Sequence, residues 1–259
     1  MDDSGLFVTT SLKARPAVVD RGKRLAIERG LTFVERKGKS ISSLVSEGSA
    51  ALVVTNEQVH LETYEGQLRF HLGTAFIRLQ AFERGELDPM LRAAEVQPGD
   101  TILDTTFGLG RDSRVMARAT GPTGQITGVE SSAGLFHLAD LGLAANGDAA
   151  SAPITLVHGD ALEYLDACDD ASFDVVLVDP MFTESTTSDQ GFELLRAVAD
   201  PTELSERWVQ VARRVARRWV VIKAANSMPW FDDANIEWVP SNSNASWYRC
   251  FAAGGEKLG

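Results

Sequence analysis

The feature that most constrains the fold is an alternation of short apolar strands with helical segments between residues 101 and 223. Strand, helix, strand at this spacing implies parallel pairing through right-handed crossovers, so we expect a doubly wound α/β sheet. The expected strands are residues 101–104, 125–130, 154–158, 173–178 and 219–223, and the expected helices are residues 111–119, 132–146, 161–167 and 202–218. Two more strand-like pieces, residues 236–240 and 246–252, would close one edge as an antiparallel pair and bring the sheet to seven strands.

The residues before this alternation have a different pattern, and the turn Pro98-Gly99-Asp100 separates the two parts. We expect residues 1–95 to form a small N-terminal α+β unit with linker helices, and residues 96–259 to form the sheet domain. In the first part the expected elements are helices at 16–29, 40–47, 74–84 and from 89, strands at 31–34 and 68–71, and a hairpin of 50–55 with 59–63.

Composition places the chain among ordinary globular proteins. Of its 259 residues 44% are hydrophobic and 24% are charged, which excludes a disordered or collagen-like chain. No apolar run approaches the roughly 20 residues of a membrane helix, and the start MDDSGLFVTT lacks the features of a signal peptide. Two cysteines, Cys168 and Cys250, are too few for a disulfide framework, so we expect a cytoplasmic protein.

Charge is distributed unevenly along the chain. The net charge of -11 argues against a surface that binds nucleic acid everywhere, but residues 13–39 and 207–218 are basic. Within the second stretch, Arg213, Arg214, Arg217 and Arg218 are expected on one side of a helix, where they could contact RNA or simply face solvent. Lys37 and Lys39 could equally be ordinary charges of a surface loop.

The string LDTTFGLGRD, residues 103–112, is typical of a cofactor loop. A strand ending in Asp104 runs into Gly108 and Gly110, which allow a ligand to approach the backbone closely, and a helix follows from Arg111 and Asp112. The string lacks the third glycine of the dinucleotide fingerprint, and a tight structural turn is the alternative interpretation.

Acidic residues also follow the next two strands. Glu130 can take both hydroxyls of a ribose, and Asp160 can accept from an adenine amine, although Asp160 could instead cap the following helix. Because the carboxyl ends of parallel strands meet at one edge, Asp104, Glu130 and Asp160 together indicate an adenosine pocket, in which we include the adjoining Ser131 and Ala161.

The fourth strand ends in VVLVDPMF, which places Asp179, Pro180 and Phe182 at the same edge. This string resembles the [DN]-P-P-[YF] motif of class I S-adenosylmethionine-dependent methyltransferases that act on amino groups. A base amine is a poor nucleophile because its lone pair is delocalised into the ring. Acceptors from the Asp179 carboxylate and the Pro180 carbonyl would favour the attacking geometry, and Phe182 would stack on the ring.

A narrower resemblance covers nearly the whole chain. The strings LDTTFGLGRDSRVMA and VVLVDPMF, with ALVVTNEQVHLE upstream and VVIK and SWYRCF downstream, resemble the small-subunit ribosomal RNA methyltransferase J family and its Gram-positive relatives. The resemblance implies a class I methyltransferase fold, S-adenosylmethionine as the cofactor and guanine N2 of ribosomal RNA in the small subunit as the acceptor. It assigns Gly108, Gly110, Arg111, Asp112, Glu130 and Asp160 to the cofactor and Asp179 to the acceptor amine.

One segment departs from that family. After DPMF the ribosomal enzymes have a Lys-rich segment, whereas this chain has TESTTSDQGFE, with Glu184, Asp189 and Glu193. Phosphate contacts favour cations, so methylation of a small-molecule or protein amine stays open as the alternative. A non-catalytic cofactor-binding module and a nicotinamide-dependent oxidoreductase stay open as well.

The histidines predict no metal site, because His137 and His158 lack paired acids at suitable spacing. In the segment FHLGTAFIR, His71 and Arg78 could reach a substrate or belong to a packed linker.

Overall fold

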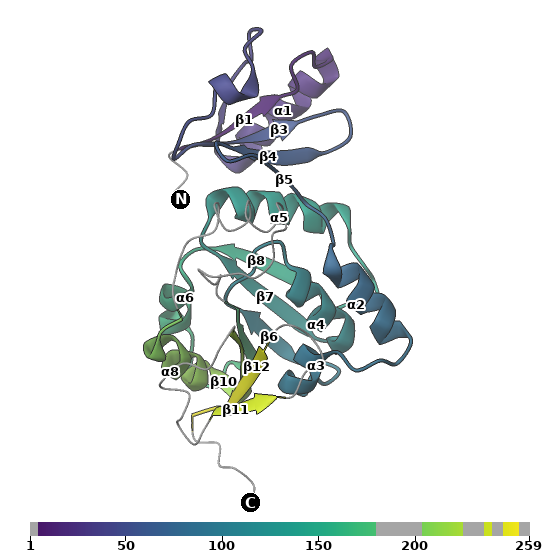
Figure 1. Cartoon of the computed structure of the whole chain (residues 1–259), viewed down its shortest axis with the longest axis vertical. Helices are drawn as coiled ribbons and strands as arrows, with labels where there is room; N and C mark the ends of the chain where they lie inside the picture. The colour runs from purple at the N-terminus through teal and green to yellow at the C-terminus, as the bar shows by residue number, and fades with distance from the viewer. Residues whose placement is uncertain (1–4, 180–203, 225–235, 240–245, 254–259) are drawn as a thin grey trace, which may run out of the picture. The chain divides into compact units, whose positions relative to one another are not determined.

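A computed structural model describes residues 5–179, 204–224, 236–239 and 246–253. The described chain forms two compact units, labelled by element in Figure 1. Residues 5–71 and 131–146 belong to the first unit, and the remaining described residues belong to the second. The linker helices that follow residue 71 therefore lie in the second unit. The division near residue 95 that the sequence suggests stays a prediction.

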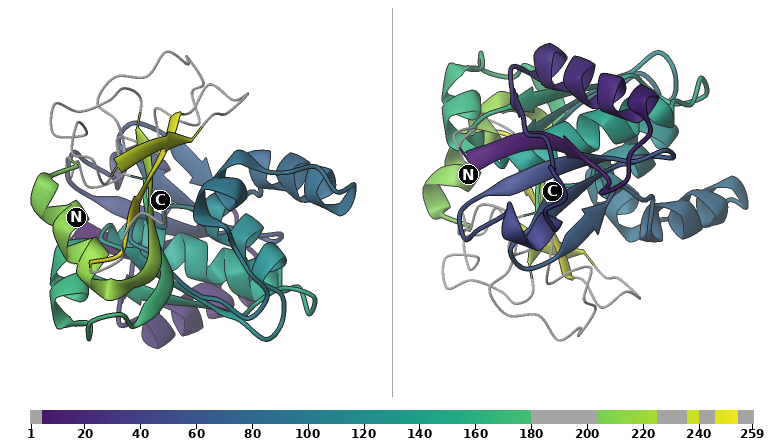
Figure 2. Two further views of the ribbon diagram at one scale, coloured as in Figure 1. Left: turned by 90° about the horizontal axis from the view of Figure 1, so that it is seen from below. Right: turned by 90° about the horizontal axis from the view of Figure 1, so that it is seen from above.

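The first unit is built on a five-stranded mixed sheet with the order β2-β1-β3-β4-β5. β1 is parallel to β2 and β3, whereas β3, β4 and β5 form an antiparallel meander. Its strands are β1 (Leu6–Thr10), β2 (Thr32–Phe33), β3 (Ala50–Val54), β4 (Val59–Thr63) and β5 (Gln67–Arg69). Two helices, α1 (Pro16–Arg29) and α5 (Ala133–Ala145), lie against these strands; α1 is seen along β1 in Figure 2.

Glycines allow α1 and α5 to approach their neighbours closely. A Cβ atom at Gly22 of α1 would lie 2.9 Å from the Phe33 ring of β2. In α5, a Cβ atom at Gly142 would collide with the ring of Phe70. The glycines therefore permit closer packing than alanine could, which offsets the cost of glycine inside a helix.

The second unit contains the seven-stranded sheet, with the order β11-β12-β10-β9-β6-β7-β8. Five strands are parallel, and β12 and β11 add an antiparallel edge beside β10, which confirms the expected fold class. The strands are β6 (Thr101–Asp104), β7 (Gln125–Glu130), β8 (Ile154–His158), β9 (Phe173–Val178), β10 (Ala216–Ala224), β11 (Ile236–Val239) and β12 (Ser246–Phe251). The helices are α2 (Thr74–Glu83), α3 (Pro89–Ala94), α4 (Arg111–Thr120), α6 (Ala161–Ala167) and α8 (Glu206–Val215).

Both faces of this sheet carry a hydrophobic core. On one face α6 and α8 pack around the fully buried Leu165 and Trp208, and on the other α3 and α4 pack around Met90 and Met116. Alternate residues of the central strands point to opposite cores, which explains why β9 reads as an uninterrupted apolar run from Val175.

Three local expectations differ from the structure. β1 was not anticipated, although its apolar and β-branched residues suit a strand. Residues 40–47 form only a short 3-10 turn (η2, Ile41–Ser43), and the expected cap Ser40 makes no side-chain capping hydrogen bond. The helix expected to reach residue 218 ends at Val215, so Arg217 and Arg218 lie on β10.

The expected helical row of arginines is therefore wrong. Each of the four instead has a partner within the second unit. Arg213 donates to the Phe251 carbonyl, and Arg214, Arg217 and Arg218 form ion pairs with Asp170, Asp174 and Asp100, respectively.

Among the described residues, no helix has the combination of length and apolarity that a membrane crossing requires.

Candidate active site

The loop between β6 and α4 has one closed side and one open side. Gly108 and Gly110 have φ values of +55° and +69°, in the left-handed region that favours glycine. A Cβ atom at Gly110 would collide with the Phe107 ring, whereas a Cβ atom at Gly108 would meet no atom of the described residues within 4 Å. As far as the described residues go, the backbone at Gly108 therefore leaves room for a ligand to approach it.

Phe107 fixes this loop beside β7. Its amide donates to the Val129 carbonyl at 3.0 Å, and its ring, 3% exposed, fills the space above Gly110 and Gly128. A side chain at either glycine would displace the ring. The glycines thus shape the loop through packing as well as through backbone conformation.

Glu130, the last residue of β7, reaches the open side of the loop. Its Oε2 accepts the Gly108 amide at 2.7 Å, and the residue is 7% exposed. Ser131 follows it directly and Arg111 begins α4; both are half-buried. The structure therefore brings the predicted glycine and the predicted ribose acid into direct contact.

Asp160 caps a helix at the neighbouring strand. Its Oδ1 accepts the Glu163 amide at 2.9 Å at the start of α6, and Ala161 is the first, buried residue of that helix. The capping interpretation is thus observed. Because a carboxylate accepts at two oxygens, capping through Oδ1 is compatible with a second contact.

Hydrogen bonds join the ends of β6 and β9. Asp179 follows β9, and its amide donates to Thr106 Oγ1 at 2.8 Å. The Thr106 amide donates to Asp104 Oδ1 at 3.0 Å, and Ser113 Oγ donates to Asp104 Oδ2 at 2.6 Å. β6 and β9 are the neighbouring strands at which the strand order reverses, and doubly wound sheets bind their ligands at such a point.

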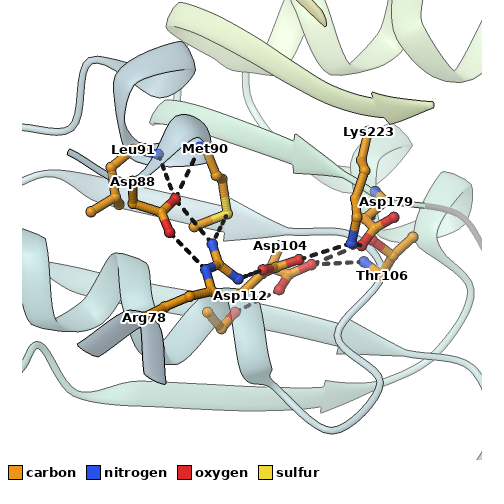
Figure 3. Close-up of polar contacts among 10 residues, drawn as sticks. Arg78, Asp88, Met90, Leu91, Asp104, Thr106, Asp112, Asp179 and Lys223 are labelled. Atoms are coloured by element: carbon orange, nitrogen blue, oxygen red, sulfur yellow. Dashed lines mark hydrogen bonds and ion pairs between the residues drawn. The ribbon is translucent and has the colours of Figure 1, made fainter. Parts of the chain in front are cut away.

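A chain of alternating charges crosses the same region, as Figure 3 shows. Lys223 Nζ lies 2.6 Å from Asp179 Oδ2 and 3.6 Å from Asp112 Oδ2. The Arg78 guanidinium pairs with Asp112 on one side and with Asp88 on the other, where Nε and Oδ2 are 2.7 Å apart. Three carboxylates thus share two cations at the carboxyl edge of the sheet.

The carboxylates in this region differ in their affinity for a proton. Burial raises the pKa of Asp104 to about 7. Burial and the neighbouring Asp112 raise the pKa of Asp179 to about 6, against the opposing charge of Lys223. Burial alone would raise the pKa of Asp112 as well, but the charges of Lys223 and Arg78 outweigh it and hold that pKa well below the usual value. Neighbouring acids whose pKa values are shifted in opposite directions are typical of active sites, although structural ion pairs produce such shifts too.

Two of the predicted catalytic residues, Pro180 and Phe182, lie outside the described residues, as do Glu184, Asp189 and Glu193. Within the described ranges there is no group of three His, Cys, Asp or Glu residues suited to hold a metal ion.

Residues 39–245 match the protein family described as "Putative SAM-dependent methyltransferase". The chain belongs to this family. It is therefore an S-adenosylmethionine-dependent methyltransferase, which confirms the enzyme class and the cofactor expected from the sequence. The non-catalytic and nicotinamide-dependent interpretations are set aside.

Two relatives of this methyltransferase are similar over different lengths. The Bacillus subtilis (strain 168) protein YpiP is 34% identical over 234 residues, which cover 87% of this chain and 91% of YpiP. Ribosomal RNA small subunit methyltransferase J of Laribacter hongkongensis (strain HLHK9) is 33% identical over 162 residues, covering 59% of this chain and 57% of that enzyme.

A crystal structure supports the methyltransferase fold. A SAM-dependent methyltransferase from Neisseria gonorrhoeae matches with a TM-score of 0.62 at 18% identity, covering 96% of this chain and 97% of its own. At this identity the likeness concerns the fold alone.

The site of the methyltransferase fits S-adenosylmethionine. The open space at Gly108 lets a ligand reach the loop backbone, and the buried Glu130 carboxylate beside it suits a pair of ribose hydroxyls.

Sequence reasoning missed most of the supporting residues of this methyltransferase. Lys223, Asp88 and Thr106 were given no role, and Phe107 was not separated from its loop. Lys223 did carry a signal, because it ends the buried run VVI of β10 with a charge at the carboxyl edge of the sheet. Asp88 meets Arg78 only because the fold brings them together, and nothing in the local sequence around Asp88 indicates this ion pair.

Proposed function

We propose that this methyltransferase modifies an exocyclic base amine, guanine N2, in ribosomal RNA of the small subunit or in another structured RNA. The observation that carries the proposal is the position of Asp179. It follows β9 directly, is tied through Thr106 to the cofactor loop, and presents a half-buried carboxylate beside Lys223. The partial similarity to methyltransferase J supports RNA as the substrate class.

In this proposal Asp179 and two residues outside the described ranges act on the acceptor. The Asp179 carboxylate and the Pro180 carbonyl accept hydrogen bonds from the amine, and Phe182 stacks on the base. S-adenosylmethionine, when bound, supplies the electrophilic methyl group. The amine nitrogen would form a bond to the methyl carbon as the bond from that carbon to the sulfonium sulfur breaks, which leaves S-adenosylhomocysteine. The nitrogen also loses one proton, for which Asp179 is our candidate acceptor. Its pKa of about 6 suits a group that holds a proton only briefly near neutral pH.

The cofactor side of the proposal uses the residues around the first loop. Glu130 holds the ribose hydroxyls, Asp160 accepts from the adenine amine, and Gly108 and Gly110 let the ligand approach the backbone. Asp104 acts mainly through the loop, because its oxygens are taken by Thr106 and Ser113. The remaining positions that we assign to this pocket are Arg111, Asp112, Ser131 and Ala161.

The deciding experiment compares modified nucleosides by mass spectrometry in ribosomal RNA from cells with and without the protein. We expect a methylguanosine to be absent from the small-subunit RNA of the deletion strain. Purified protein with labelled S-adenosylmethionine should restore it in RNA from that strain. Identical nucleoside profiles in the two strains would reject ribosomal RNA as the substrate.

Methylation of a small-molecule or protein amine is the second candidate function. It is favoured by the acidic residues after Asp179, Glu184, Asp189 and Glu193, which would repel phosphates. Turnover on a neutral amine that does not change with salt would support it, whereas RNA binding should weaken steeply as salt is added.

A further inference from the structure

One edge of the N-terminal sheet collects exposed cations from loops that are separate in sequence. We propose that this edge binds the phosphate backbone of the RNA substrate. We name it the cationic edge and define it by Lys13, Arg15, Lys37 and Lys39. The inference rests on the proposed function, because it requires that the substrate be RNA.

The topology of the sheet creates the edge. β1 is parallel to both β2 and β3, so the carboxyl ends of all three strands lie on the same side. The loops that leave these ends are residues 11–15, 34–40 and 55–58. The first loop carries Lys13 and Arg15, and the second carries Lys37 and Lys39.

Hydrogen bonds anchor each of the three loops to a neighbouring element. The Ser11 amide donates to the Val54 carbonyl at 3.0 Å, and the Arg36 Nη1 donates to the Thr10 carbonyl at 3.3 Å. The guanidinium of Arg21 in α1 donates to the carbonyl of Thr55. Each loop is therefore fixed by a hydrogen bond to the end of a neighbouring strand or to α1.

The second loop presents its lysines to solvent. Arg36 Nε donates to the Lys39 carbonyl at 2.9 Å, and the Lys39 amide donates back to the Arg36 carbonyl at 2.8 Å. This closes a tight turn in which Lys37 has a φ of +44°, a value uncommon for a residue with a side chain. Arg36 is thus used to build the turn, while Lys37 and Lys39 are exposed on it.

Among the described residues, no acid forms an ion pair with the cations of the edge. Within the described part of the chain, none of the four forms an ion pair or a side-chain hydrogen bond. The acids carried by these loops and by the first half of α1 are Glu35, whose carboxylate lies 3.8 Å from Lys23, Glu57 in the third loop and Asp20. The three loops together hold five Lys and Arg residues against these two glutamates, a net charge of +3.

The cationic edge differs in charge from the rest of the chain. Residues 13–39 carry nine Lys and Arg residues against three Asp and Glu residues, whereas the whole chain has a net charge of -11. The other basic stretch is used internally, because Arg214, Arg217 and Arg218 pair with acids of the second unit. A polyanion is repelled by most of an acidic protein, so a local group of cations determines where it can bind.

The test measures binding of unmodified small-subunit ribosomal RNA, transcribed in vitro, to the full chain at several salt concentrations. The edge variant combines Lys13→Gln, Lys37→Gln and Lys39→Gln. The control variant removes three exposed cations from the second unit, Arg84→Gln, Arg92→Gln and Arg207→Gln. Both variants lose three positive charges, so only the location differs. Thermal shift by S-adenosylmethionine verifies that each protein is folded.

We expect the edge variant to bind the RNA at least about tenfold more weakly near 0.15 M salt, with the control within about twofold of the wild type. The slope of log affinity against log salt should fall by about 2 to 3 in the edge variant, since each lost phosphate contact removes about 0.7 to 0.9. Lys37→Gln alone should lower it by about 1.

Two outcomes would overturn the inference, and they are distinguishable. If the wild type binds the RNA and the edge variant binds with the same affinity and slope, RNA stays the substrate but the cationic edge is not its binding surface. If the wild type does not bind the RNA at any salt concentration, the proposed RNA substrate fails and the inference fails with it.

Discussion

The ammonium of Lys223 lies 2.6 Å from Oδ2 of Asp179, although the two residues are 44 positions apart in the sequence. They meet because β10 is the parallel neighbour of β9, so both carboxyl ends lie at the same edge of the sheet. Lys223 also approaches Asp112, so two acids share one cation. The proton affinity of Asp179 therefore depends on a residue that the motif around it does not contain.

Lys223→Gln should shift the pH dependence of methyl transfer to higher pH. The pKa of Asp179, raised to about 6 by burial and by Asp112, is held down by Lys223, so removing the ammonium should raise it further. If transfer requires the ionised Asp179, the rising limb of the rate profile moves upward by about one to three pH units. Arg84→Gln, which breaks an exposed ion pair with Glu86, serves as the control. Superimposable profiles for wild type and Lys223→Gln would contradict the role given to this pair.

Asp179→Ala should separate catalysis from cofactor binding. The carboxylate contacts the acceptor in our proposal, so we expect transfer to fall about 100-fold or more while the dissociation constant for S-adenosylmethionine changes less than about threefold. Asp179→Asn keeps an acceptor oxygen and should recover part of the rate. Single-turnover kinetics and calorimetry measure the two quantities. Equal activity of the alanine variant and the wild type would exclude the role.

Gly108→Ala and Gly110→Ala should have different consequences. Both positions have positive φ, so an alanine at either costs about 1 to 2 kcal/mol. Only at Gly110 would the new methyl collide with Phe107, which should add about 1 to 3 kcal/mol of destabilisation. Gly108→Ala should instead weaken cofactor binding more than it lowers stability. Urea unfolding and cofactor titration of the pair test this, and a larger stability loss at Gly108 would refute the packing argument.

Glu130→Gln should weaken S-adenosylmethionine binding by about 10- to 100-fold. A charged hydrogen bond is worth about 1.5 to 3 kcal/mol, and each 1.4 kcal/mol is about tenfold in affinity. The glutamine can still accept the Gly108 amide, so the loop should stay in place. Glu83→Gln, an exposed acid of α2 paired with Arg118, is the matched control. Unchanged affinity by calorimetry would remove Glu130 from the pocket.

Asp104→Asn should reduce the pH dependence of stability. Burial raises the folded-state pKa of Asp104 to about 7, above its unfolded value. The folded state therefore binds the Asp104 proton more tightly than the unfolded state does, and this binding stabilises the fold by at most about 4 kcal/mol. The contribution to the free energy of unfolding is fully present below about pH 4 and is lost as the pH rises through about 7. The asparagine variant should lack this loss when urea unfolding is compared at pH 4.5 and 8.

Asp174→Asn is a control of opposite sign for that measurement. Although partial burial opposes the effect, hydrogen bonds from Thr101 hold the pKa of Asp174 below its usual value. Wild-type stability from this group is therefore lost as the pH falls, not as it rises. If both asparagine variants changed the pH dependence in the same direction, the sign assigned to Asp104 would be wrong.

The larger sheet could be predicted from sequence because local patterns define it. Its strands are short apolar runs, and the antiparallel edge of residues 236–239 and 246–251 followed from the same pattern. The acids at the strand ends were predictable for the same reason, since parallel strands bring their carboxyl ends together.

What the sequence did not reveal depends on contacts between distant residues. The charge chain needs Arg78 from α2, Asp112 from α4 and Lys223 from β10, and no local pattern joins these elements. The end of α8 was misplaced because residues 213–218 carry arginines and alanine, which suit a helix. Pairing of β10 with both β9 and β12 outweighs that local preference.

The direct junction of α8 and β10 limits how this chain can vary. The helix ends at Val215 and the strand begins at Ala216, so no loop residues separate them. β10 is paired on both sides, with Ile222 opposite Val178 and Lys223 opposite Trp247. One residue inserted or deleted at the junction would have to be absorbed at the register irregularity between Ala216 and Trp219, or it would shift the rest of the strand. A slip of one position along the strand would turn Lys223 to the opposite face of the sheet. Unless the irregularity takes up the change, the length of α8 at the far end of the strand therefore sets whether Lys223 stays beside Asp179.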